Sequence, residues 1–229
     1  MVFPVARSIA DRYGFKDFPH SSHRLLLQWV GDTPQKVLDV GTATGFLGQA
    51  LTRAGHTVVG IESDPDAAQL ARSHYAALHL VDLQNLRLLP EAPFAAVLVG
   101  DVLEHMADPA AALHRLVAQL TPTGSVIVSV PNVAFVQVRL ALLAGRFEYR
   151  KRGILDDTHV RFFTRRTFRR LLVAEGLRVV RMVGVPPPLP LLAPAFARWP
   201  ARFLLELASL AARVWPTLFA YQFVAEATR

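Results

Sequence analysis

The chain contains no cysteine among its 229 residues. This absence excludes disulfide bonds, thiolate metal ligands, iron–sulfur clusters and a cysteine nucleophile. It is consistent with a cytoplasmic protein, which is the location that we expect. Charged residues are also few, at 19%, whereas hydrophobic residues make up 52%, so the composition excludes an intrinsically disordered chain.

An export signal and long apolar runs are also lacking. Residues Met1–Lys16 include Arg7, Asp11 and Arg12 and show no apolar core followed by a small-residue cleavage site, so we expect no signal peptide. Charges and prolines leave no run of about 18 apolar residues in 186–220, which is the length that a membrane-spanning helix needs. Peripheral contact with the inner face of a membrane stays open.

The net charge of +7 comes from one segment. Residues 139–181 hold 12 Lys and Arg against 4 Asp and Glu, whereas residues 1–138 hold 9 against 12. Such an excess suits an anionic substrate, nucleic acid or an acidic membrane surface, and it is equally typical of a solvated arginine-rich face.

Short apolar runs alternate with helical patterns from residue 37 onward, which predicts a mainly parallel sheet flanked by helices. Asp108-Pro109 predicts one helix start, because aspartate caps a helix and proline suits its first turn. Helices are expected at 46–54, 66–75, 108–120, 164–176 and 201–214. The expected strands are Lys36–Val40, Thr57–Ile61, Leu78–Val81, Ala95–Gly100, Ser125–Val130, Leu177–Val185 and Ala220–Ala225.

We interpret 1–229 as a single domain, with 1–34 as an N-terminal helical cap and 186–216 as an insertion between the last two strands. The insertion begins with Pro186–Pro194, where five of nine residues are proline, and this predicts a stiff connection to the helix at 201–214. That helix has a wide apolar face, for which three roles remain possible: burial inside the protein, contact with a second subunit in a homodimer, or contact with a membrane surface. Its polar residues form one narrow stripe: Arg202, Glu206, Ser209 and Arg213.

The first strand leads into a glycine-rich turn, 41–45, which lets the backbone approach a ligand. The turn departs from the dinucleotide fingerprint, because Ala43 and Phe46 stand where its second and third glycines belong. Asp39 would repel a pyrophosphate but suits a cationic ligand. Glu62 lies about 20 residues beyond Gly41 at the end of the second strand, where an acid accepts hydrogen bonds from ribose hydroxyls.

Four motifs in order resemble those of class I S-adenosylmethionine-dependent methyltransferases, including the ubiquinone-type O-methyltransferases. The resemblance covers roughly residues 20–185. It implies an α/β fold with a doubly wound, mostly parallel sheet of seven strands, whose last strand is antiparallel and follows a helical insertion. It also implies S-adenosylmethionine as the cofactor. The motifs are Val37–Leu47, Val59–Glu62, Val81–Leu83 and Gly100–His105.

The resemblance gives each motif residue an expected role. Asp101 would lie at the end of the fourth strand, facing the sulfonium, and Glu62 would hold the ribose. Asp82 would bind the adenine amino group, with Leu83 beside it. The methionine end of the cofactor would be surrounded by Asp39, Gly41, Thr42 and Gly45.

Candidate acceptor-side residues lie outside the cofactor positions. His159 is our leading candidate for a base that orients or deprotonates the acceptor, although it could equally tie its loop to the core. Arg161 is expected to contact an anion or carbonyl. Asp101 and His105 are further catalytic candidates, although we favour a structural role for His105. His23 and Asn132 are expected on the substrate side, and no metal is expected because a third carboxylate ligand is not evident.

We therefore predict O-methylation of a small-molecule, glycan or lipid-linked acceptor. One alternative is a methyltransferase of nucleic acid that binds the phosphates with its 139–181 segment, and another is a protein that binds the cofactor without catalysis. No Asn/Asp-Pro-Pro-Tyr motif follows the fourth strand, so we expect no nucleic-acid partner. The intact acids and glycines argue against a non-catalytic protein.

Overall fold

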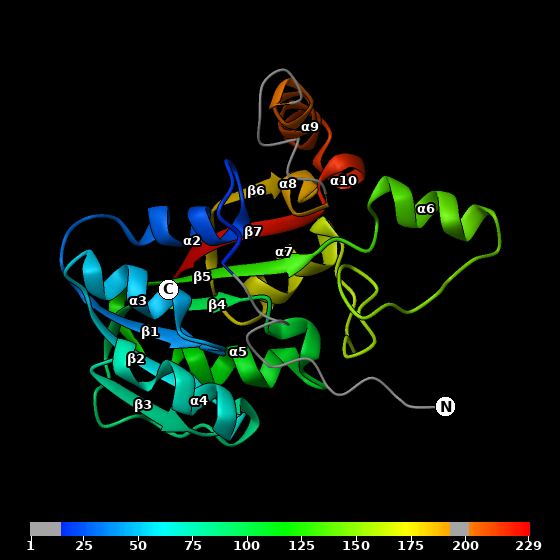
Figure 1. Cartoon of the computed structure of the whole chain (residues 1–229). Coiled ribbons are helices and arrows are strands. Elements are labelled where there is room, and N and C mark those ends of the chain that lie inside the picture. The colour runs from blue at the N-terminus through cyan, green and yellow to red at the C-terminus, as the bar shows by residue number, and fades with distance from the viewer. Residues whose placement is uncertain (1–14, 193–201) are drawn as a thin grey trace, which may run out of the picture.

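The computed structural model describes residues 15–192 and 202–229 of the chain. Its centre is a seven-stranded sheet with the order β3-β2-β1-β4-β5-β7-β6 (Figure 1). β7 pairs antiparallel with both β5 and β6, whereas β1 to β5 pair in parallel, so the predicted sheet is confirmed. The strands are β1 (Lys36–Val40), β2 (Thr57–Glu62), β3 (Ala77–Leu80), β4 (Phe94–Gly100), β5 (Leu120–Pro131), β6 (Arg178–Val185) and β7 (Gln222–Thr228).

The expected helix signals act as caps in the structure. The Asp108 side chain accepts a hydrogen bond from Ala111 N, and Thr164 forms a reciprocal capping box with Thr167. The prediction missed helices at Val136–Leu143, Leu189–Leu192 and Pro216–Phe219, as well as two of the three 3₁₀ turns. The α-helices are α2 (Ser22–Val30), α3 (Phe46–Arg53), α4 (Pro65–Ala71), α5 (Pro109–Val117), α6 (Val136–Leu143), α7 (Arg165–Ala174), α8 (Leu189–Leu192), α9 (Arg202–Val214) and α10 (Pro216–Phe219), and the 3₁₀ turns are η1 (Arg72–His74), η2 (Leu83–Asn85) and η3 (Leu103–His105).

Helices cover both faces of the sheet because successive strand residues point to opposite sides. Leu98 belongs to an apolar cluster that includes residues of α2 and α3. Its neighbours Val97 and Val99 belong to a second cluster, with residues of α5 and α7. Near-continuous apolar runs in β1, β2 and β4 are therefore explained by burial on both faces.

The sheet order reverses between β1 and β4. The chain passes from β1 outward to β2 and β3 and then returns to β4 on the other side of β1. In open α/β sheets, such a reversal leaves a crevice at the carboxyl ends of the two strands. Gly41 and Asp101 directly follow these ends, so the fold brings together two motifs that are far apart in the sequence.

The helix α9 does not bury the whole of its apolar face. Glu206 and Arg213, from the predicted polar stripe, approach the His20 ring at 3.4 Å each, and Ser209 is buried. The side of α9 that faces the protein is therefore mixed, because Ser209 is buried together with Leu205 and Ala212, while Glu206 and Arg213 reach His20 from exposed positions. Plain burial of the wide apolar face was thus the wrong alternative. Its exposed members are Phe203, Leu204, Leu207, Leu210 and Val214.

Two predicted segments extend beyond what the structure describes. Residues 1–14 of the predicted N-terminal cap and residues 193–201 of the predicted insertion lie outside the described ranges. Among the helices in 15–192 and 202–229, none combines the length and apolar character that crossing a membrane requires.

Candidate active site

The turn after β1 has a backbone that glycine makes accessible. Gly41 and Gly45 have φ values of 71° and 83°. A Cβ on Gly41 would lie 2.8 Å from Val102 Cγ2, so the segment after β4 packs directly against this turn. Ala43 also has a positive φ, 47°, which is strained for alanine, and its N–H donates to Glu62 Oε2 at 2.8 Å. Glu62 thus holds the turn in place.

Asp39 lies beneath this turn with one oxygen free. Its side chain is 1% exposed, and Oδ2 accepts a 2.6 Å hydrogen bond from the Tyr75 hydroxyl. The other oxygen, Oδ1, is buried without a hydrogen-bond partner, as is Thr42 Oγ1. Burial raises the pKa of Asp39 to about 6, although the bond from Tyr75 opposes the rise. Sequence reasoning missed Tyr75, because it lies outside every motif.

The remaining predicted cofactor residues follow the ends of β2 and β3. Glu62 Oε1 accepts hydrogen bonds from Ser63 N and Asp64 N, at 2.8 and 3.0 Å. A carboxylate offers about four lone pairs, so Glu62 keeps capacity for a ribose hydroxyl. Asp82 caps η2 by accepting from Gln84 N, and Leu83 beside it is buried.

These residues fit the expected cofactor. Glycine at 41 and 45 lets the turn pack closely, because a Cβ at either position would collide with Val102 or with His74 and Ala71. The unpaired oxygens of Asp39 and Thr42 offer acceptors to an ammonium group. Asp39, Glu62 and Asp82 lie at or just after the carboxyl ends of three neighbouring strands, an arrangement that suits a ligand with cationic and hydroxyl groups and without phosphate. When bound, the cofactor supplies a methyl group on a sulfonium.

Asp101 is the centre of a polar network at the end of β4. Its Oδ1 accepts from Ser129 Oγ at 2.6 Å, and both oxygens accept from Gln222 Nε2 at 2.9 Å. Its Oδ2 also accepts from Lys16 Nζ at 2.6 Å. Burial alone would raise the pKa of Asp101, but the Lys16 ammonium and these hydrogen bonds hold it below its usual range. Lys16 and Gln222 were missed because they come from opposite ends of the chain.

An aromatic stack lies over the start of α3. The His23 ring stacks on Phe46 with 4.7 Å between centroids and on Phe15 with 5.7 Å. His23 Nδ1 accepts a 3.0 Å hydrogen bond from Lys16 N. Burial, with a further contribution from the Lys16 ammonium, lowers the pKa of His23 to about 3. His23 is therefore neutral at physiological pH, and its predicted contact with an acceptor stays a prediction.

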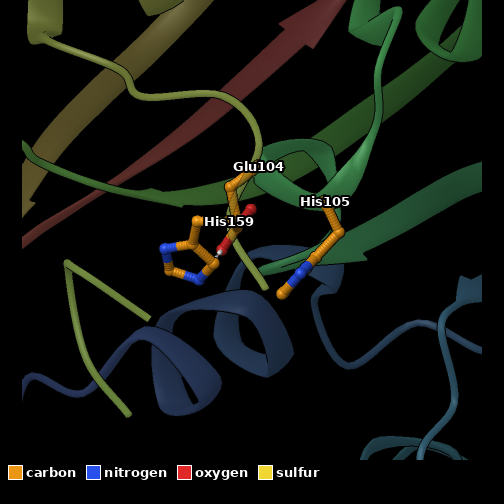
Figure 2. A group of neighbouring side chains, drawn as sticks. All are labelled: Glu104, His105 and His159. Carbon is orange, nitrogen blue, oxygen red and sulfur yellow. Dashed lines mark ion pairs between the residues drawn. The ribbon is translucent and has the colours of Figure 1, made fainter. Parts of the chain in front are cut away.

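A group of three side chains, Glu104, His105 and His159, joins η3 to the loop before α7 (Figure 2). His159 Nε2 lies 4.0 Å from Glu104 Oε1, and both Glu104 oxygens are buried without a hydrogen-bond partner. His159 Nδ1 lies 3.0 Å from the Ile154 carbonyl, and His105 Nδ1 lies 3.2 Å from the Thr158 carbonyl. Because a carbonyl can only accept, both rings carry a hydrogen on Nδ1, so the neutral form of each ring has its lone pair on Nε2.

This group can hold a proton or a cation. Burial raises the pKa of Glu104 well above its usual value, and the nearby Asp101 charge adds to the rise. Burial and the neighbouring His159 lower the pKa of His105. The ligand atoms of the three side chains lie within 4.8 Å of one another, and imidazole with carboxylate suits a transition metal. The absence of a metal stays a prediction. Sequence reasoning missed Glu104, although it lies inside the fourth motif.

Two predicted substrate contacts have structural partners. Asn132 is fully buried, donates from Nδ2 to Ala220 O at 2.8 Å and accepts at Oδ1 from Ala134 N at 3.0 Å. Arg161 donates from Nε and Nη2 to Ala107 O, at 2.9 and 2.5 Å. Asn132 thus stabilises the turn after β5, and Arg161 ties its loop to the start of α5. Their contacts with an acceptor stay predictions without support from this geometry.

Comparison with known proteins is consistent with this geometry. Residues 10–182 match the methyltransferase domain family. The chain is 32% identical over 128 residues to the ubiquinone biosynthesis O-methyltransferase of Rhodopseudomonas palustris (strain TIE-1), covering 54% of this chain and 50% of that protein. The same-named protein of Xylella fastidiosa (strain 9a5c) is 32% identical over 130 residues, covering 54% and 52%. The chain therefore spans about half the length of these relatives.

The fold also matches a solved structure with a bound ligand. Magnesium protoporphyrin IX methyltransferase from Synechocystis PCC 6803, solved with SAH, superposes with a TM-score of 0.63 over 92% of this chain and 83% of that chain. The sequence identity is 16%, so this likeness concerns the fold alone.

Proposed function

Because the chain belongs to the family of S-adenosylmethionine-dependent methyltransferases, we propose that it transfers the cofactor's methyl group to an oxygen of a small, lipid-linked acceptor. Such a transfer is a direct displacement at the methyl carbon, so the protein has to align the acceptor oxygen with the sulfonium. The acceptor hydroxyl also has to lose its proton.

The observation that carries this proposal is the contact between Glu104 and His159 close to the end of β4. His159 Nε2, which carries the lone pair of the neutral ring, lies 4.0 Å from Glu104 Oε1, and Glu104 is a buried carboxyl without a hydrogen-bond partner. Asp101 acts electrostatically on both Glu104 and His105, which supports a role for this group near the expected sulfonium. His159 takes the acceptor proton, and Glu104 stabilises the imidazolium that results. O-methylation is also what the names of the two curated relatives state for those proteins.

Incubation with radiolabelled S-adenosylmethionine and separated lipid, glycan, nucleic-acid and small-metabolite extracts tests this function. We expect label in the lipid or small-metabolite fraction, and less of it with the His159→Ala variant. Label confined to nucleic acid, or no transfer to any fraction despite cofactor binding, would contradict the proposal. The Asp32→Asn variant, altered at an exposed position, is the matched control.

An exposed apolar surface on α6 and the loop after it supports a lipid-linked acceptor. We call Leu140, Leu142, Leu143, Phe147 and Tyr149 the α6 surface, and each of these side chains is at least 42% exposed. In Figure 1, α6 projects away from the sheet. Arg146, Arg150 and Lys151 lie in the same loop and are exposed. Exposed leucines and aromatics with neighbouring cations suit the surface of an anionic bilayer.

The occupant of the α6 surface is an anionic bilayer in this proposal, and vesicle flotation tests it. We expect the protein to float with phosphatidylglycerol vesicles and not with phosphatidylcholine vesicles, and Leu140→Asp with Leu143→Asp to abolish flotation. Leu88→Asp, at a position that is 69% exposed outside this surface, is the control. Protein that remains at the bottom of both gradients, or that forms a dimer through these leucines in light scattering, would exclude the bilayer as occupant.

For the nucleic-acid alternative, three arginines of 139–181 are engaged within the fold. Arg139 donates to Ala134 O and Thr217 O, and Arg161 donates to Ala107 O. Arg181 pairs with Glu226 at 2.7 Å and lies over the Trp29 ring. These three side chains stabilise the fold and are not free cations for phosphates. The other basic residues of the segment include exposed ones such as Arg165 and Arg169, so the extract experiment tests the nucleic-acid alternative.

A further inference from the structure

We propose that Tyr75 is a positioning residue for the cofactor. Its hydroxyl fixes Asp39 so that one carboxylate oxygen remains for the methionine ammonium, and the site thereby favours ligands that carry an amino-acid end. This role concerns the cofactor site and is independent of the acceptor. Tyr75 belongs to none of the four motifs, and its role follows from where the fold places its ring and its hydroxyl.

The backbone holds Tyr75 against the sheet. Tyr75 follows η1 and precedes β3, and its N–H donates to Arg72 O at 3.3 Å. The N–H of the next residue, Ala76, donates to Val58 O on β2 at 2.8 Å. The Tyr75 side chain packs against two apolar clusters, one of which includes residues of α3 and β1. The ring therefore points into the protein from a fixed main chain.

Two glycines make room for the Tyr75 ring. Gly60 on β2 is the register partner of Asp39 on β1, and register partners in a sheet present their side chains to the same face. A Cβ on Gly60 would lie 3.0 Å from Tyr75 Cδ1, among other close contacts, and a Cβ on Gly48 in α3 would overlap with the ring. Glycine is unfavourable inside a helix or a strand, but at these two positions its missing side chain lets the ring reach Asp39.

The Tyr75 hydroxyl engages one oxygen of Asp39 and leaves the other. It donates to Asp39 Oδ2 at 2.6 Å, and the Gly48 backbone makes a hydrogen bond to the same hydroxyl. Burial and the Asp39 charge raise the pKa of Tyr75, so the hydroxyl stays protonated and acts as a donor to the carboxylate. Among the described residues, Asp39 Oδ1 has no hydrogen-bond partner. The hydroxyl thus determines which oxygen stays open to a ligand.

Tyr75 also favours the ionised form of Asp39. Burial raises the pKa of Asp39, and the Glu62 carboxylate adds to the rise. A hydrogen bond to the ionised form opposes both effects, and the Tyr75 hydroxyl supplies it. Without this hydroxyl, a larger fraction of Asp39 would be protonated near neutral pH. The cofactor ammonium would then meet a neutral carboxyl in place of a fixed carboxylate, which weakens the attraction in a buried site.

The effect should be confined to one end of the ligand. Asp39 lies beneath the turn at 41–45, whereas the residues expected to bind ribose and adenine, Glu62 and Asp82, lie at the ends of β2 and β3. S-adenosylhomocysteine carries an amino-acid end that can use Asp39 Oδ1. The related compound 5′-methylthioadenosine has the adenosine and the sulfur but no amino-acid end. Loss of the Tyr75 hydroxyl should therefore weaken the binding of the first ligand and leave that of the second unchanged.

Calorimetric titration of the whole chain with these two ligands tests the role. For Tyr75→Phe, which keeps the ring, we expect S-adenosylhomocysteine to bind about tenfold more weakly and 5′-methylthioadenosine to bind as it does to the unaltered protein. Gly48→Ala should give the same pattern, because its Cβ displaces the ring while the hydroxyl is retained. Tyr221→Phe is the matched control, because it removes a hydroxyl that bonds to the Ile154 backbone, and it should change neither affinity.

A double-mutant cycle shows whether Tyr75 acts through Asp39. In the Asp39→Ala background the hydroxyl has no carboxylate to hold, so adding Tyr75→Phe should cause no further loss of affinity for S-adenosylhomocysteine. A further loss there would mean that Tyr75 contacts the ligand directly, which overturns the proposal. Equal weakening of both ligands by Tyr75→Phe would make it a packing residue, and unchanged binding of S-adenosylhomocysteine would remove it from the site. An unaltered protein that binds neither ligand would overturn the proposal together with the cofactor assignment.

Discussion

Replacing Asp39 by asparagine should remove a pH-dependent loss of stability. In the folded protein, burial raises the pKa of the Asp39 carboxyl from 3.8 to about 6. An acid with a raised pKa binds more protons in the folded state, so its contribution to stability is fully present below pH 3.8 and is lost as the pH rises towards 6. An asparagine side chain does not titrate, so the Asp39→Asn variant keeps its stability over this range.

The size of the effect follows from the shift. About two pKa units correspond to about 3 kcal/mol in the free energy of unfolding, of which about 2 kcal/mol falls between pH 4.5 and pH 8. At about 2–4 °C per kcal/mol for a domain of this size, the melting temperature of Asp39→Asn should rise relative to the unaltered protein by about 4–8 °C over that interval. The new amide adds a constant offset, which cancels when two pH values are compared.

Calorimetric melts at several pH values between 4.5 and 8 measure this difference, with Asp32→Asn as the control for an exposed carboxylate. Calorimetric titration with S-adenosylmethionine should show weaker binding by Asp39→Asn, because the ammonium of the cofactor loses a charged partner. A difference in melting temperature that does not change with pH would refute the reasoning, since it would mean that Asp39 does not titrate in this range. Unchanged cofactor affinity would place the methionine end elsewhere.

The remaining predictions concern cofactor binding and catalysis. Glu62→Ala should weaken the binding of S-adenosylmethionine and S-adenosylhomocysteine alike by about 1–3 kcal/mol, measured by calorimetry, because it removes the acceptor for the ribose hydroxyls. If the variant binds both ligands as tightly as the unaltered protein does, the ribose site lies elsewhere. His159→Ala should lower turnover about a hundredfold to ten-thousandfold while leaving the cofactor dissociation constant in place; near-normal turnover in a radiolabel assay would make His159 structural. Glu104→Gln should raise the melting temperature at pH 8, since the raised pKa of Glu104 means that stability is lost as this carboxyl ionises; an unchanged or lower melting temperature would contradict this.

Sheet and cofactor motifs were predictable because their signals are local. Each buried strand appears as a short apolar run, and Asp108 and Thr164 mark helix starts with side chains that cap the adjacent backbone. The α6 helix was missed for a physical reason. Its residues are apolar on nearly every side, but only Val138 is buried, so no amphipathic period marks it.

The acceptor side was predictable only in part, because it is assembled from distant segments. His159 was identified by its residue type, whereas its partner Glu104 was overlooked beside the more familiar His105. Lys16 comes from the segment before α2 and Gln222 from β7, and only the sheet order brings them to Asp101. No local period or spacing signals such a contact.

The distribution of strain and unpaired groups separates the crevice from the rest of the described protein. Within residues 15–192 and 202–229, the buried side-chain oxygens without a partner belong to Asp39, Thr42 and Glu104. Among the described non-glycine residues with positive φ, Ala43 and Asp101 follow the ends of the same two strands, and the third, His20, lies before α2. Unpaired buried groups and strained backbone each cost about 1–3 kcal/mol, and a fold accepts them where surrounding contacts fix the geometry. Their convergence on the β1 and β4 ends indicates that the crevice is shaped for a ligand whose cation and hydroxyls supply the missing partners.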